Sequence, residues 1–143
     1  MTVKQISVFI ENKEGRMKKT MKALGKENIN IRALSLADTS KYGILRLIVS
    51  DNEAAVKALE EDGFIVRKTE VLVVFVPDQP NGLNTVLESF EKDKINVEYL
   101  YAFVSNKVDE AIVVMRLENM EAGKSALEKN NITILTEEDI KNL

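Results

Sequence analysis

The sequence predicts an α+β fold made of two tandem ferredoxin-like βαββαβ sandwiches that share an eight-stranded antiparallel sheet, with the helices on one face. Three observations lead to this prediction. The chain of 143 residues contains an internal duplication, and each copy alternates between strand and helix periodicity in the same order. With 45% hydrophobic residues, 30% charged residues and only two prolines, the composition is that of a globular protein.

The duplication is visible when ISVFIENKEGRMKKTMKALGKENINIRAL is laid over LVVFVPDQPNGLNTVLESFEKDKINVEYL. In this alignment Phe9 falls on Phe75 and Asn30 on Asn96, and the apolar positions coincide almost throughout. After a short insertion near residues 108–109, Leu59 falls on Leu127. The alignment therefore predicts one domain over residues 1–70 and a second over residues 71–143.

The first half of each copy reads as strand, helix, strand. In the first copy, Ile6–Ile10 is apolar and rich in β-branched residues, which predicts a strand. Apolar residues then recur at helical spacing, at Met17, Met21 and Leu24. The segment Ile29–Leu36 alternates between apolar and polar residues, which predicts a second strand.

The second half of the copy reads as strand, helix, strand again. The pair Tyr42-Gly43 is a turn signal, and Ile44–Val49 predicts a strand that closes a hairpin. The Asp51-Asn52 pair can cap a following helix, which ends at Gly63. A last strand then covers Phe64–Val66, which completes the βαββαβ unit.

The two copies are expected to pack as one rigid body. A domain of about 70 residues buries only about 60% of its unfolded surface and is marginal alone. Only Thr69-Glu70 separates the copies, with no linker-like stretch of Gly, Ser or Pro. Pairing of edge strands into one eight-stranded sheet would also protect an exposed strand edge.

Composition excludes many functions. The chain has no cysteine and no histidine, so disulfides, thiolate nucleophiles, zinc-thiolate sites and Ser-His-Asp catalysis cannot be built. We therefore expect a non-enzyme without cofactor or bound metal. The net charge of -3 disfavours a nucleic-acid partner. There is no signal-peptide core and no long apolar run, so we expect a cytoplasmic protein that does not bind membranes.

The candidate site is the loop between the first strand and the first helix of each copy. These loops read Asn-Lys-Glu-Gly-Arg-Met from Asn12 and Asp-Gln-Pro-Asn-Gly-Leu from Asp78. Glycine and asparagine are the residues that most readily adopt positive φ, so each loop can turn directly into its helix. Unpaired N–H groups and the positive end of the helix dipole then suit a carboxylate. Asp78 could accept a hydrogen bond from an ammonium group, as could the amide oxygen of Asn12.

The second loop, with D-x-P followed by Asn81 and Leu83, resembles the opening of the ACT domain, a small-molecule regulatory module of amino-acid metabolism. Asn30-Ile31 and Asn96-Val97 resemble its second motif, N-I-N-I, and the βαββαβ order is also similar. The first loop departs from the pattern because Asn12 stands at the acidic position and Glu14 at the proline.

The resemblance implies a regulatory protein that binds a free amino acid between its two ACT-like domains and acts on an enzyme or regulator in trans. Up to two pseudo-equivalent sites would follow, one for each loop. The residues expected to bind the ligand are Asn12, Gly15, Arg16, Met17, Asp78, Asn81, Gly82 and Leu83.

Structural roles compete with this interpretation. Gly15 and Asn81 could serve only to turn the chain, and Asn12 or Asp78 could serve only as helix caps. Met17 and its counterpart in the second copy are also expected to be core residues, because they begin the apolar stripe of each helix.

An aromatic face is the second feature with a functional interpretation. Tyr99, Tyr101 and Phe103 alternate along one strand and therefore point to one face of the sheet. If Leu34 and Leu100 face the helices, the aromatic side chains lie on the uncovered face, which predicts a homo-oligomer interface. Base stacking is the alternative, but the acidic charge argues against it.

Two other functions remain as alternatives: a protein-interaction module without a ligand, and an acylphosphatase-like hydrolase that would use Arg16. The hydrolase rests on fold analogy, and the phosphate-binding loop of that family is absent. The acidic run Glu137-Glu138-Asp139 is expected to belong to a solvated tail.

Overall fold

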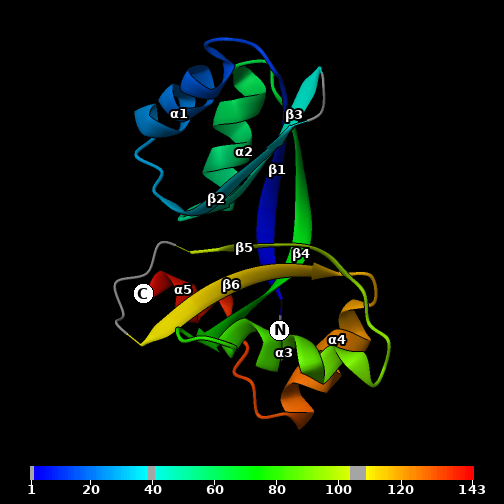
Figure 1. Cartoon of the computed structure of the whole chain (residues 1–143). Helices are drawn as coiled ribbons and strands as arrows, with labels where there is room; N and C mark the ends of the chain where they lie inside the picture. Colours follow the sequence, from blue (N-terminus) through cyan, green and yellow to red (C-terminus); the bar gives the residue numbers. More distant parts are fainter. Residues whose placement is uncertain (1, 39–40, 104–108) are drawn as a thin grey trace. The chain divides into compact units, whose positions relative to one another are not determined.

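The computed structural model describes residues 2–38, 41–103 and 109–143. The chain divides into two compact units (Figure 1). The N-terminal unit comprises Lys4–Thr69, and the C-terminal unit comprises Glu70–Leu143 with Met1–Val3. The insertion expected near residue 108 adjoins residues outside the described part of the chain.

The N-terminal unit follows the predicted βαββαβ order. Its elements are β1 (Val3–Glu11), α1 (Arg16–Lys26), β2 (Ile31–Asp38), β3 (Tyr42–Val49), α2 (Asn52–Glu61) and the first part of β4 (Ile65–Pro77). The side chain of Asp51 accepts a hydrogen bond from the Ala54 N–H at 3.1 Å, so Asp51 caps α2 as expected. Gly63, at φ 89°, follows the end of this helix.

The C-terminal unit repeats the order up to its last strand. After the remainder of β4 come α3 (Gly82–Glu91), β5 (Val97–Ala102), β6 (Glu110–Leu117), α4 (Met120–Lys129) and α5 (Glu137–Lys141). In place of a final strand, Ile134 forms an isolated antiparallel bridge with Val74. The ferredoxin-like pattern of two βαββαβ copies is therefore present, with a shortened end in the second copy.

The described sheet has six strands in the order β2-β3-β1-β4-β6-β5, whereas the sequence predicted eight. The first of the two missing strands is explained by β4, which continues through Thr69-Glu70, where the sequence predicted a boundary between two strands. The expected last strand of the first copy and first strand of the second are therefore one element. The other is the strand that the bridge at Ile134 replaces.

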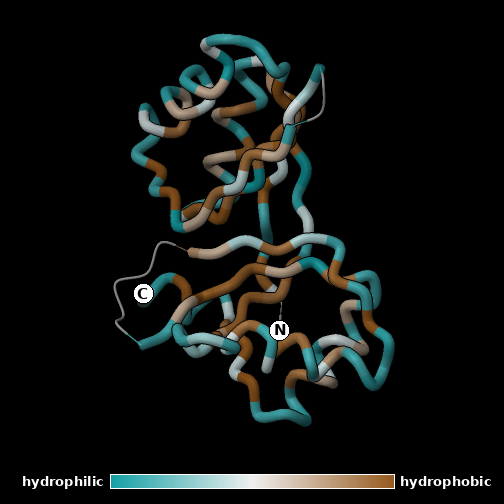
Figure 2. Tube along the Cα trace, in the orientation of Figure 1, coloured by the Kyte–Doolittle hydropathy of each residue, from teal (hydrophilic) through white to brown (hydrophobic). Residues whose placement is uncertain are grey.

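Each unit has its own apolar core between its helices and its strands. Register places Ile6 opposite Leu47 in the N-terminal unit and Leu72 opposite Met115 in the C-terminal unit, and all four side chains are buried. Both clusters include apolar residues from the two helices of their unit. In Figure 2 the apolar stretches run mainly along the strands, whereas the loops are largely hydrophilic. Periodicity therefore identified the buried faces of the helices and of the inner strands, whereas Leu34 on β2 and Leu100 on β5, which were expected to face the helices, are exposed.

Two local expectations are wrong. Tyr42 and Gly43 lie inside β3 rather than in a turn, since both are paired with the end of β1. The acidic run near the C-terminus forms the start of α5 (Glu137–Lys141) rather than a tail, although its three acidic side chains are exposed, as expected. Thr136 and Asp139 form a reciprocal capping box at its start, and Ile140 is buried.

The segment after each first helix has the same backbone geometry in both units. Asn28 and Lys94 have φ values of 55° and 51°, and the following N–H groups of Ile29 and Ile95 reach back to the helix. This is the hydrogen-bond pattern of a helix stop that leads into the next strand. The segments Asn28-Ile29-Asn30 and Lys94-Ile95-Asn96 therefore have the same structural role in the two copies.

Within the described part of the chain, no helix is long and apolar enough to cross a membrane. The same residues contain no group of three or more acidic, cysteine or histidine side chains placed to hold a metal ion.

Candidate functional site

The two predicted loops have the same backbone hydrogen bonds. The Asn12 N–H donates to the Lys41 carbonyl at 2.9 Å, and the Asp78 N–H donates to the Asp109 carbonyl at 3.1 Å. Each loop is thereby attached to the hairpin of its own unit. One residue further on, Lys13 and Gln79 both donate to the carbonyl two residues back. The loops are thus structural counterparts as well as aligned segments of sequence.

Each loop enters its helix through a left-handed residue. Gly15 has φ 83° and Asn81 has φ 72°, and both occupy the cap position of their helix. In neither α1 nor α3 does a side chain cap the helix by accepting a hydrogen bond from a backbone N–H of the first turn. The alternative in which Asn12 or Asp78 serves as a helix cap is therefore wrong. The first turn of each helix keeps backbone N–H groups that have no acceptor within the helix itself.

Steric contact explains Gly82 at the first position of α3. A Cβ atom added there would lie 2.0 Å from the carbonyl oxygen of Pro77, which is far inside contact distance. At the aligned position of the N-terminal unit the chain carries Arg16 instead. Met17 and Leu83, one residue later, are half-buried and pack against the core of their units, as expected.

Two clefts flank the loop of the N-terminal unit. The smaller, which we call the Asn12 cleft, has a volume of about 160 Å³. Asn12 and Met17 line it together with Glu11, Leu36 and Asp38. The structure therefore brings two predicted site residues together with two carboxylates. The sequence did not identify Glu11 and Asp38 because they lie at the ends of two different strands, β1 and β2.

The larger cleft, which we call the Arg16 cleft, has a volume of about 380 Å³ and opens at the ends of β1 and α2. Both cationic and aromatic side chains line it. The side chains that define it are Phe9, Glu11, Arg16, Lys19, Tyr42 and Phe64. Only Arg16 among these was predicted. Glu11 directly precedes the predicted loop, and Lys19 lies one helical turn after Arg16, so sequence position could have indicated both. Tyr42 and Phe64 come from segments that no motif connects to the loop.

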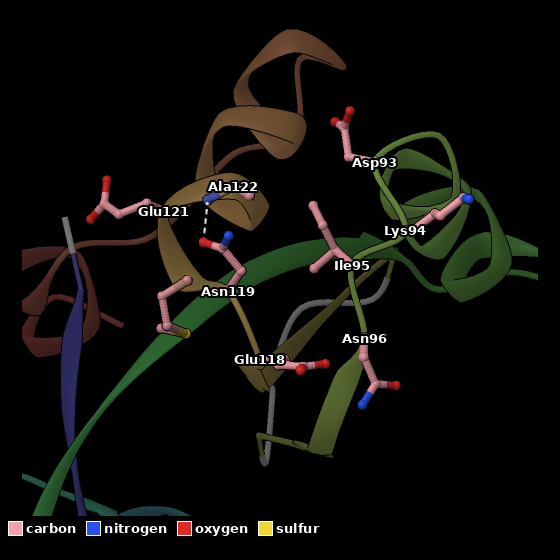
Figure 3. Close-up of a pocket in the computed structure, with 9 residues that line it drawn as sticks. Asp93, Lys94, Ile95, Asn96, Glu118, Asn119, Glu121 and Ala122 are labelled. Carbon is pink, nitrogen blue, oxygen red and sulfur yellow. Dashed lines mark hydrogen bonds between the residues drawn. The ribbon is translucent and has the colours of Figure 1, made fainter.

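A third cleft lies in the C-terminal unit, between the end of α3 and the start of α4 (Figure 3). Its volume is about 570 Å³, and its lining includes Asp93, Lys94, Glu118 and Glu121. The Asn119 side chain already accepts a hydrogen bond from the Ala122 N–H at 3.0 Å, so the helix start carries its own cap (Figure 3). This cleft contains none of the predicted site residues.

The aromatic side chains of β5 and of Phe103, which directly follows it, do not form an exposed surface. Register pairs Leu100 with Met115, which belongs to the core that the helices cover, and pairs Tyr101 with Val114, so the aromatic residues lie on the opposite face. Leu100 is nevertheless 38% exposed. However, Tyr101 and Phe103 are each only 8% exposed, and Tyr99 is half-buried. The expected exposure is wrong because alternation identifies the face of a strand and not what covers that face. Homo-oligomerisation remains a prediction, without support from this face.

Comparison with known proteins agrees with the resemblance of the loops. The family described as "ACT domain pair" matches residues 1–143. A crystal structure of protein BT0572 from Bacteroides thetaiotaomicron is 38% identical, with a TM-score of 0.92, and the match covers 100% of this chain and 98% of that one. No curated protein matches the chain.

More distant structures share the fold. The ligand-free regulatory subunit of aspartate kinase from Thermus thermophilus is 16% identical with a TM-score of 0.64, and the match covers 88% of this chain and 90% of that one. The regulatory subunit from Thermus flavus is 18% identical with a TM-score of 0.62 and the same coverage. At these identities the likeness concerns the fold alone.

Proposed function

The chain belongs to the ACT domain pair family, and from this premise we propose that it is a regulatory protein that binds a free amino acid and acts on an enzyme or regulator in trans. The observation that carries the proposal is the shared geometry of the two loops. Each turns through a left-handed residue into a helix that lacks a side-chain cap. Such a helix start attracts the carboxylate that every free amino acid carries.

In the N-terminal unit, the groups around the loop match both charges of an amino acid. The helix start beyond Gly15 and the guanidinium of Arg16 suit the carboxylate. Glu11 and Asp38 supply carboxylates for the ammonium group, and Asn12 supplies an amide oxygen. The proposal therefore concerns a zwitterion at this loop.

In the C-terminal unit, the same function would rest on fewer side chains. Asp78 is exposed and could accept a hydrogen bond from the ammonium group, and Asn81 provides the turn. Gly82 allows close approach of α3 to Pro77, and Leu83 packs against the core. We retain all four as candidate residues of a second loop, in which only the backbone and Asp78 would contact the ligand.

Thermal denaturation of the full chain in the presence of each of the twenty amino acids tests the proposal. A ligand at about 100 times its dissociation constant stabilises the folded state by about 2.7 kcal/mol, which is readily measured. We expect stabilisation by a restricted set of amino acids. If none stabilises the protein at millimolar concentration, the proposed function is wrong.

A loop variant separates binding at this site from binding elsewhere. Gly15→Trp places a bulky side chain at the helix start, where a Cβ atom meets nothing within 4 Å. Because φ 83° strains a residue with a Cβ, the unfolding temperature of this variant without ligand is measured first to show that it is folded. We expect it to abolish the ligand-induced shift. Gly15→Asn is the matched control, because Asn81 already serves the same backbone geometry in the C-terminal unit. Equal shifts in the wild type and in Gly15→Trp would remove the loop from the site.

A further inference from the structure

We propose that the Arg16 cleft holds an amino acid with an aromatic or large apolar side chain, and that each chain carries one such site. The inference rests on the proposed function and adds the class of the ligand and its position. It commits to one of the two clefts that flank the first loop. With a volume of about 380 Å³, the Arg16 cleft is within the range of about 300–1,000 Å³ that is usual for small-molecule pockets.

The cleft carries charges of both signs at one end of α1. Arg16 lies 3.7 Å from Glu11, measured from Nη2 to Oε1, which is a loose ion pair that a ligand can enter. The Lys19 ammonium donates a hydrogen bond to the Asp62 carbonyl at 3.2 Å, which fixes the ammonium group beside the cleft. The two cations would bind a carboxylate, and Glu11 would bind an ammonium group. A zwitterion satisfies this set without leaving a charge unpaired.

Aromatic rings supply a place for the rest of the ligand. Phe9, Tyr42 and Phe64 all line the cleft, and the Lys19 ammonium lies 5.4 Å from the centre of the Phe64 ring. Tyr42 and Ile65, which also line it, are 59% and 66% exposed. Large apolar side chains that gather at a cleft and remain exposed are typical of a binding site. They favour an aromatic or large aliphatic side chain over a small or charged one.

The C-terminal unit cannot provide an equivalent set. Its hydrogen bonds place Gly82, Thr85, Glu110 and Ile132 at the positions of Arg16, Lys19, Tyr42 and Phe64. Both cations and two of the rings are therefore absent. At Gly82 the Pro77 carbonyl leaves no room for any side chain. One site for each chain follows.

Isothermal titration of the full chain with L-phenylalanine, L-leucine, L-alanine and L-aspartate tests the inference. We expect the first two to bind with one molecule for each chain, and the last two to bind at least tenfold more weakly. Arg16→Gln and Lys19→Gln should each weaken the binding of L-phenylalanine tenfold or more, because each removes a charge-assisted hydrogen bond. Phe64→Ile, which copies the C-terminal unit, should reduce the preference for the aromatic ligand.

Controls separate the possible failures. Lys22→Gln removes the same charge from the exposed face of α1, outside the cleft, and should leave affinity unchanged. Unfolding temperatures of all variants identify any loss of fold. If Asn12→Ala weakens binding while Lys19→Gln and Phe64→Ile do not, the ligand occupies the Asn12 cleft, and this inference is wrong although the proposed function stands. If no amino acid binds, the proposed function itself fails.

Discussion

Replacement of Gly82 by alanine tests whether this residue is required by packing. The added Cβ would lie 2.0 Å from the Pro77 carbonyl oxygen, so the start of α3 must move by about 1 Å to reach even a tight contact of 3.0 Å. That oxygen also accepts the Gln79 N–H at 2.9 Å, and the Gly82 N–H donates to the Gln79 carbonyl at 3.0 Å. Overpacking costs about 1–3 kcal/mol and a weakened hydrogen bond about 1 kcal/mol more. We therefore expect a loss of about 2–4 kcal/mol of the free energy of unfolding.

Urea denaturation followed by circular dichroism measures this loss. Gly25→Ala is the matched control, because a Cβ atom at this helical position meets nothing within 4 Å. It should stabilise the protein by about 0.5–1 kcal/mol through helix propensity. If Gly82→Ala unfolds within about 0.5 kcal/mol of the wild type, the steric argument is refuted. Packing would then not explain the glycine at position 82, and a role in ligand binding would be the remaining explanation.

Two further predictions concern stability. Asn81→Ala should cost about 1–2 kcal/mol because φ 72° is unfavourable for residues with a Cβ, whereas Asn81→Gly should not. Both variants lose the hydrogen bond with Asn84, so equal urea midpoints would contradict the backbone explanation. At α5, hydrogen bonds from the Thr136 N–H and then its hydroxyl lower the pKa of Asp139. This contribution is complete above the ordinary value of about 3.9 and is lost as pH falls through the folded-state pKa, so Asp139→Asn should flatten stability against pH below about 4. Parallel acid profiles would argue against it.

The duplicated periodicity was sufficient to predict the βαββαβ order, because apolar residues at strand and helix spacing reveal which faces are buried. It was not sufficient to count strands. Thr69-Glu70 is polar, yet a strand passes through such a pair without interruption when it still has neighbours to pair with. Likewise Tyr42-Gly43 has the composition of a turn, but its pairing with β1 places it inside a strand.

At the candidate site, the sequence predicted the backbone conformation of the two loops. It did not predict most of the side chains that line the two clefts beside the first loop. Gly15 and Asn81 were expected to adopt positive φ, and both do so, since residue type strongly limits that conformation. The carboxylate of Asp38 and the ring of Phe64 lie beside the loop only because β2 and the turn before β4 fold back to it. A single sequence has no motif that joins such distant positions.

The two loops show how one backbone supports different chemistry. Their hydrogen bonds and left-handed turns match, yet the residue that follows the turn is Arg16 in one unit and Gly82 in the other. In the C-terminal unit the backbone of Pro77 occupies the space that a side chain would need. No single substitution at Gly82 can therefore transfer the cation to that unit, because any Cβ meets the carbonyl oxygen first. The duplication preserved a helix start suited to carboxylates in both units, and the packing at Pro77 confines a cation at this position to the N-terminal one.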